Sequence, residues 1–281
     1  MKKIADAFLF SSVFIAVCAL LMVAQTFQLL HLSNLNYWYY LFIAGGTIAS
    51  YNLHWHFTDI NGSNADNSVR LVWTLKHKNL LIPLAITGLL IAAVSFYFLK
   101  GYWYWIFIGA GLAFLYTAPK IPGKLSLFLR KIAIAKTIYL SLAWTYVTAV
   151  LPIIISGQPF TITAFFFLLH RYFFLYALCV LFDIRDREDD IKQGIRSLIT
   201  FFNDRGIAIL FYLSAATSII TANVFAYMNK FSLPGFLLSL PLLIAMVLFP
   251  FAKKSKNDYL YYFVLDGLMP LSFLFTCFQH N

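Results

Sequence analysis

Charged side chains are scarce in this chain of 281 residues: 11% are Asp, Glu, Lys or Arg, 61% are hydrophobic, and the mean hydropathy is +0.78. A soluble domain needs more polar surface than this, so the composition excludes the ordinary soluble globular class. The apolar stretches are long and continuous. They therefore predict membrane-spanning helices rather than a closed barrel.

Cysteine is also scarce, with only Cys18, Cys179 and Cys277 in the chain. All three lie in apolar stretches and show no metal-type spacing, so they are most simply small apolar residues. No cysteine-based metal site is predicted.

The apolar stretches are long enough to cross a bilayer, which takes roughly 20 residues of helix. They number nine, at 5–30, 36–56, 79–99, 101–117, 132–155, 160–184, 205–228, 232–251 and 258–279. The first is too long for the apolar core of a cleaved signal peptide and has no clear cleavage site, so we expect it to be retained. We predict an all-α membrane protein of nine transmembrane helices, forming one polytopic domain over residues 1–281.

Basic residues gather in alternate connecting segments. With a cytoplasmic N-terminus, the inner segments hold 18 of the 21 Lys and Arg residues, all except Lys100, Arg171 and Lys230. The positive-inside rule then predicts that the N-terminus is cytoplasmic and the C-terminus is on the opposite side. The net charge of +10 is explained by attraction to anionic lipid headgroups, and because it is spread over loop ends, we expect no nucleic-acid partner.

Five of the eleven acidic residues fall between positions 183 and 190, at the inner end of the sixth predicted helix. On a helix, Asp183, Asp186 and Asp190 stand at i, i+3 and i+7, which aligns three carboxylates along one face. This face suits a hard cation such as Mg²⁺, completed by phosphate oxygens. The alternative is a solvated helix end with surface ion pairs.

Two other polar clusters are predicted at the same side of the membrane. One runs from Tyr51 to Asp59 and contains His54 and His56, whose i, i+2 spacing does not suit a zinc pair on a helix. The other leaves the fourth helix between Tyr116 and Lys124. A weak internal repeat, with Asn52 and Asp183 131 residues apart, would bring the inner ends of helices two and six together.

The acidic segment and its continuation resemble the second aspartate-rich motif of the UbiA superfamily of intramembrane prenyltransferases, DxxDxxxD followed by G-K-R-T. The residues that match are Asp183, Asp186, Asp190, Gly194, Arg196 and Ser197. Tyr116 and Lys120 also fit the YxxxK pattern of that family. The resemblance implies a helical bundle whose central cavity opens toward the cytoplasm, with Mg²⁺ held by Asp183, Asp186 and Asp190.

The first motif of the family, NDxxDxxxD, departs from the pattern. Its positions fall on Asn52, Leu53, His56 and Ile60, so only the Asn is kept. In the family both motifs hold Mg²⁺ ions that grip an isoprenyl diphosphate. The missing carboxylates therefore remove one side of that clamp.

By resemblance, the chain is predicted to transfer an isoprenyl group from a prenyl diphosphate to a lipophilic, membrane-associated acceptor. The three aspartates would act in catalysis through the metal, and Asn52, His56, Tyr116, Lys120 and Arg196 would contact the substrate. Two alternatives stay open: a catalytically silent relative that binds an isoprenoid lipid or a partner enzyme, and a small-solute transporter. A transporter would place ionisable groups at mid-membrane, where Arg171 and Asp266 are the obvious candidates.

Overall fold

The computed structural model describes residues 2–33, 36–58, 68–117, 136–192, 197–230 and 234–277, and throughout these ranges the regular structure is helical. The helices of the N-terminal half are α1 (Lys2–Phe10), α2 (Val13–Leu29), α3 (Tyr37–His56), α4 (Val69–Lys76), α5 (Lys78–Phe98), the short 3₁₀ turn η2 (Lys100–Tyr102) and α6 (Trp103–Thr117). Those of the C-terminal half are α8 (Lys136–Thr145), η5 (Tyr146–Val150), α9 (Leu151–Ser156), α10 (Ile162–Lys192), α11 (Leu198–Phe201), α12 (Asp204–Met228), α13 (Pro234–Ala252), η6 (Leu260–Leu265) and α14 (Asp266–Thr276).

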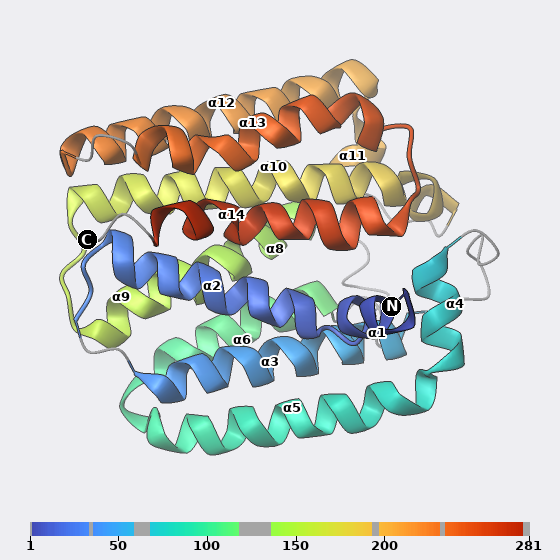
Figure 1. Ribbon diagram of the computed structural model, residues 1–281, viewed down its shortest axis with the longest axis horizontal. Helices are drawn as coiled ribbons and strands as arrows, with labels where there is room; N and C mark the ends of the chain where they lie inside the picture. The colour runs from blue at the N-terminus through green and yellow to red at the C-terminus, as the bar shows by residue number, and fades with distance from the viewer. Residues whose placement is uncertain are drawn as a thin grey trace.

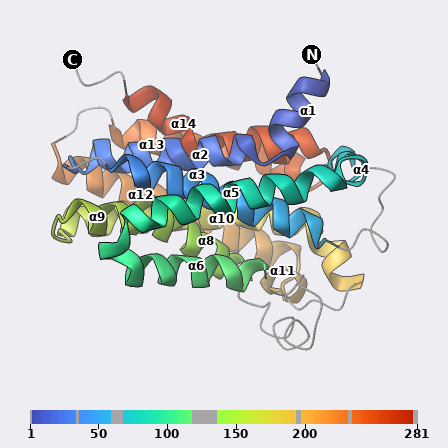
Figure 2. The ribbon, with the colours of Figure 1, turned by 90° about the horizontal axis from the view of Figure 1, so that it is seen from below.

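The long helices lie roughly side by side in a bundle (Figures 1 and 2). Among the described residues, five segments are long and apolar enough to cross a membrane: Lys78–Phe98, Lys136–Ser156, Ile162–Glu188, Asp204–Met228 and Gly235–Ala252. A sixth is added if α1 and α2 form one bent span, and η6 with α14 is a shorter apolar helix. The all-helical membrane class is thus confirmed, while nine crossings and a cytoplasmic cavity stay predictions.

The first predicted helix, 5–30, is wrong in one respect, because α1 and α2 meet at a 60° bend instead of running straight. Ser12 adopts a left-handed conformation with φ of 69° at the break. The amide of Asn52 donates a hydrogen bond of 3.0 Å to the Ser11 carbonyl oxygen. A side chain from α3 therefore satisfies a backbone group that the break leaves outside the regular helix.

The helices α3 and α5 approach each other closely at two glycines. A Cβ added to Gly45 would lie 2.6 Å from the Gly88 carbonyl oxygen, and the reverse substitution would meet the Gly45 oxygen at the same distance. Ala49 and Ala92 follow these glycines by four residues, so each helix presents a small-xxx-small face to the other. The opposite side of α5 exposes Ile86, Leu90 and other large apolar side chains, as expected of a lipid-facing surface.

Arg171 is buried in the middle of α10, where its guanidinium donates a 2.9 Å hydrogen bond to Gln25 of α2. The Gln25 amide donates in turn to Ser272 of α14 at 2.8 Å. Arg171 therefore joins three helices of the core through neutral partners. Arg171, one of the two mid-membrane residues on which a transporter would depend, thus has a structural role in the core.

Two π-helical turns interrupt the helices of the C-terminal half, η5 between α8 and α9 and η6 before α14. The α1 helix, α4 and the C-terminal end of α10 lie at one end of the bundle, and the C-terminal end of α14 points to the other (Figure 1). The end of α3 that carries Asn52 also lies toward that first end. The ends of α3 and α10 therefore lie at the same end of the bundle, and the closer grouping that the internal repeat predicts stays a prediction.

Candidate functional site

The acidic segment is the last part of α10, which continues without a break from Ile162 to Lys192. Asp183, Asp186 and Asp190 are therefore helical, as the i, i+3, i+7 spacing requires. Their environments differ: Asp183 and Asp190 are buried, whereas 41% of the Asp186 side chain is exposed. The three carboxylates do not form one equivalent set.

Asp183 and Asp190 share a cation from α8. The Lys136 ammonium lies 3.0 Å from Asp183 Oδ1 and 3.2 Å from Asp190 Oδ2. The hydroxyl of Thr137 donates a hydrogen bond to the other oxygen of Asp183. Burial raises the pKa of the Asp190 carboxyl above its usual value, and the Lys136 charge opposes this rise.

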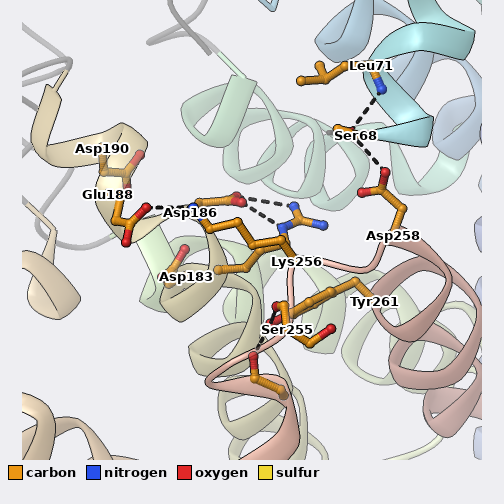
Figure 3. A network of polar contacts seen from close by, with 12 residues as sticks. Ser68, Leu71, Asp183, Asp186, Glu188, Asp190, Ser255, Lys256, Asp258 and Tyr261 are labelled. Carbon is orange, nitrogen blue, oxygen red and sulfur yellow. Dashed lines mark hydrogen bonds and ion pairs between the residues drawn. The ribbon is translucent and has the colours of Figure 1, made fainter. Parts of the chain in front are cut away.

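Asp186 faces a different partner. It accepts hydrogen bonds of 2.7 and 3.4 Å from the Arg185 guanidinium (Figure 3). Arg185 itself lies against aromatic side chains, with its Cζ 4.7 Å from the ring centre of Tyr261 and 4.9 Å from that of Tyr262. Asp186 is thus held toward η6, while Asp183 and Asp190 are held toward α8.

A second buried arginine, Arg70, comes from α4. It is 2% exposed, and its Cζ lies 4.4 Å from the Trp55 ring and 5.4 Å from the Tyr262 ring. Burial lowers its pKa to about 10, so the guanidinium stays protonated at neutral pH. The sequence marked Arg70 only as one of the inner basic residues, and nothing in the local pattern distinguishes it from the others.

Asp258 fixes the start of α4 from the far end of the chain. Its carboxylate accepts hydrogen bonds from the Ser68 hydroxyl at 2.9 Å and from the Arg70 backbone N–H at 2.8 Å. The bond between Ser68 and Asp258 is drawn in Figure 3. Because Asp258 lies two residues before η6, the same segment positions both α4 and the aromatic ring of Tyr262.

Tyr262 is therefore shared by Arg70 and Arg185, which approach its ring at 5.4 and 4.9 Å. Arg70 Nε and Arg185 Nη1 are both buried and have no hydrogen-bond acceptor within the described part of the chain. Arg70, Tyr262, Ser12 and Asp266 line one small cavity at this place. Two guanidinium groups therefore lie near the end of α3, where the resemblance predicts carboxylates.

The predicted substrate contacts are placed only in part. Asn52 is buried and donates to the Ser11 and Ile48 carbonyls, and its Oδ1 has no partner among the described residues. His56 is the last residue of α3, with its ring against Phe57. Tyr116 belongs to the last turn of α6, and Lys120 and Arg196 lie outside the described residues.

The residues that the structure describes do not fit the Mg²⁺ ion that the resemblance implies. Within the described ranges, no three or more His, Cys, Asp or Glu side chains are grouped closely enough to hold a metal. Lys136 stands between Asp183 and Asp190, and Arg185 binds the carboxylate of Asp186. Mg²⁺ binding stays a prediction from the resemblance.

The comparison with protein families decides the identity at this level. The model of the UbiA prenyltransferase family matches residues 74–263, which is more than half of the chain. The chain belongs to this family. The match contains the acidic end of α10 and Lys136, whereas Asn52, His56 and Arg70 precede it.

No curated protein and no solved structure matches the chain. Family membership supports a prenyltransferase-type function and an integral membrane location.

Proposed function

We propose that this UbiA family protein transfers an isoprenyl group from a prenyl diphosphate to a lipophilic acceptor at the membrane. The observation that carries the proposal is the match over residues 74–263, which contains the buried Asp183 and Asp190 with their partner Lys136 at one end of an apolar bundle. A diphosphate and a hydrocarbon chain need such a boundary, because one is strongly hydrated and the other is soluble in lipid.

The reaction breaks the bond between C1 of the prenyl chain and its diphosphate oxygen, and C1 bonds to the acceptor, which then releases a proton. Negative charge grows on the leaving diphosphate as that bond breaks. Donors aimed at those oxygens lower the barrier. The N–H groups of Arg70 and Arg185 that lack acceptors are suited to this task.

Positive charge grows on the prenyl carbon at the same time, and aromatic faces stabilise such charge. Tyr51 and Trp55 line the same small cavity as Arg70. The Trp144 indole donates a 3.2 Å hydrogen bond to the Tyr51 hydroxyl, which fixes the direction of that ring. We assign these aromatic residues to the C1 end of the prenyl chain, and the contacts of Tyr116, Lys120 and Arg196 stay predictions.

A second candidate function is a catalytically silent protein that holds an isoprenoid lipid or a partner enzyme. It is favoured by the absence of carboxylates at Leu53 and His56 of the first motif. The pairing of Asp183 and Asp190 with Lys136 also favours it, because carboxylates that already have a cation from the chain do not need a ligand to balance their charge.

Ligand binding distinguishes these two functions from each other and from functions that involve neither ligand. We would titrate detergent-purified protein with geranylgeranyl and farnesyl diphosphate and with the uncharged alcohols, using the Asp183→Asn, Asp186→Asn variant for comparison. The exposed Asp204→Asn change is the matched control, since its side chain is 60% exposed in a surface ion pair. Diphosphate binding that is lost in the double variant but kept in the control supports the enzyme, and an acceptor screen follows.

Equal affinity for the diphosphates and the alcohols, indifferent to both aspartates, would exclude the transferase and favour the silent lipid-binding protein. If neither kind of ligand binds, both functions are wrong.

A further inference from the structure

We infer that cationic side chains of this chain replace Mg²⁺ at the end of the bundle that carries the acidic segment. Lys136 takes the position between Asp183 and Asp190 that a metal ion from solution would otherwise take, and Arg70 and Arg185 supply the donors for the anion. The identity of that anion as a prenyl diphosphate depends on the proposed function. The statement about Lys136 does not.

The position of Lys136 is the first step. Its ammonium lies within 3.2 Å of one oxygen from each carboxylate, and both aspartate side chains are at most 10% exposed. A Mg²⁺ ion bound to the same oxygens would need ligand distances of about 2.0–2.1 Å, so the ammonium and the metal ion exclude each other. The lysine is covalently attached, which favours it over an ion that must be captured from solution.

The second step concerns the remaining ligands of a possible metal site. Thr137 donates to Asp183, and Arg185 makes two hydrogen bonds to Asp186. Each carboxylate of the motif is therefore already bonded to a donor of the chain. The first motif offers no replacement ligands, since Leu53 and His56 stand where carboxylates would be.

The third step is the charge beside the end of α3. Arg70 and Arg185 bring two guanidinium groups to the ring of Tyr262, at 5.4 and 4.9 Å. Arg70 is 2% exposed, and a buried donor without an acceptor carries a free-energy cost that a phosphate oxygen would remove. In a metal-dependent site the ion supplies this charge. Here two side chains supply it.

The test of Lys136 uses Mn²⁺ alone as a spectroscopic substitute for Mg²⁺, since both prefer oxygen ligands. The paramagnetic resonance signal of free Mn²⁺ would be followed during titration of detergent-purified protein. Three proteins are compared: the unchanged chain, Lys136→Met, and the matched control Lys256→Met. Lys256 also binds a carboxylate of this segment, Glu188 at 2.6 Å, but both members of this pair are exposed.

We expect Lys136→Met to bind one Mn²⁺ at millimolar or lower concentration, and the other two proteins to bind none. Adding Asp183→Asn to Lys136→Met should abolish the binding. Mn²⁺ binding by the unchanged chain that depends on Asp183 would overturn the inference. Absence of binding by a folded Lys136→Met protein would overturn it too, because Lys136 would then not be what keeps the ion out.

Lys136→Met leaves two buried carboxylates without their cation and could prevent folding. In that case the melting temperature of the protein without substitutions is measured with and without Mg²⁺. We expect millimolar Mg²⁺ not to raise this melting temperature, because an ion that does not bind the native state does not stabilise the protein. A rise that disappears in Asp183→Asn would contradict the inference.

The anion part is tested with geranylgeranyl diphosphate in the presence of either EDTA or Mg²⁺. Equal affinity in both conditions, with a loss of about tenfold or more in Arg70→Met, is expected for a charge-assisted contact. The Lys256→Met control should keep its affinity. Binding that requires Mg²⁺ would refute this part, whereas no binding in either condition would refute the proposed function and leave the Mn²⁺ result standing.

Discussion

Single side chains at the polar end of the bundle join segments that are distant in the sequence. Asp258 is the clearest case, since it is 5% exposed and binds both the Ser68 hydroxyl and the Arg70 backbone N–H. It acts as an N-terminal cap for α4, supplied by a residue 188 positions away. Because Arg70 is the second residue of α4, the same carboxylate helps to set the position of its buried guanidinium.

Asp258→Ala is therefore expected to lower the free energy of unfolding by about 1–3 kcal/mol, through loss of the cap and of a buried acceptor. Asp258→Asn should lose less, because its amide oxygen still accepts a hydrogen bond. Unfolding by SDS in mixed micelles, followed by tryptophan fluorescence, measures both changes. The control Asp204→Ala removes an exposed carboxylate and should have a much smaller effect. Equal losses at positions 258 and 204 would mean that the cap adds nothing.

At the scale of helices, the contact between α3 and α5 depends on the absence of side chains. Gly45 and Gly88 approach so closely that a Cβ on either would meet a backbone oxygen at 2.6 Å. Backbone cannot move aside as the end of a flexible side chain can. Close packing of small residues is also the main way in which helices attract one another where water is absent.

Gly45→Ala should consequently destabilise the protein by about 1–3 kcal/mol, by forcing α3 and α5 apart. Gly46→Ala is the matched control, since a Cβ there meets nothing within 4 Å. The control should be neutral or stabilising by about 0.5–1 kcal/mol, because Ala favours the helix more than Gly does. The same SDS titration compares them, and similar values for the two neighbours would refute the packing argument.

How far the sequence predicts these elements depends on the range of the interactions. The helical spacing of Asp183, Asp186 and Asp190 is local, so it follows from the sequence and is observed. The shared ring of Tyr262 joins residues 70 and 185 through long-range packing, for which an aromatic-rich sequence gives no specific signal. Lys136 has the same limitation: in the sequence it is only one of the inner basic residues, near the start of the predicted helix 132–155.

The first helix shows a different limitation. Its hydropathy predicts one span over 5–30, and the average hides the pair Ser11 and Ser12 at which the 60° bend occurs. Two adjacent serines within an apolar stretch are a weak signal, because serine is tolerated within membrane helices when it bonds to a carbonyl. The Asn52 amide that bonds to the Ser11 carbonyl at this bend comes from α3, and only the folded structure brings it there.

At the scale of the whole molecule, charge and shape together predict the orientation in the membrane. Most basic residues belong to the segments at the end of the bundle that carries α4 and the end of α10, while Lys230 lies between α12 and α13. The start of α1 and the end of α14 lie toward opposite ends (Figure 1). Such an arrangement agrees with an odd number of crossings and with positive charge on the cytoplasmic side.

Cysteine labelling tests this orientation. Lys256→Cys and Lys230→Cys would be introduced separately after replacing Cys18, Cys179 and Cys277. Because Lys256 belongs to the predicted inner segments and Lys230 does not, an impermeant maleimide should reach position 256 only in inside-out vesicles and position 230 only in right-side-out ones. Labelling of both positions from one side would contradict the predicted topology.

The two π-helical turns affect how this chain should be aligned with its relatives. A π-helical turn contains one residue more than an α-helical one, and each residue of a helix corresponds to about 100° of rotation. Where a relative has an uninterrupted α-helix, the alignment therefore needs a one-residue gap within Tyr146–Val150 or Leu260–Leu265. Without that gap, every residue of α14 would be compared with a residue on a different face of the helix, and Asp266 would be matched to the wrong neighbour.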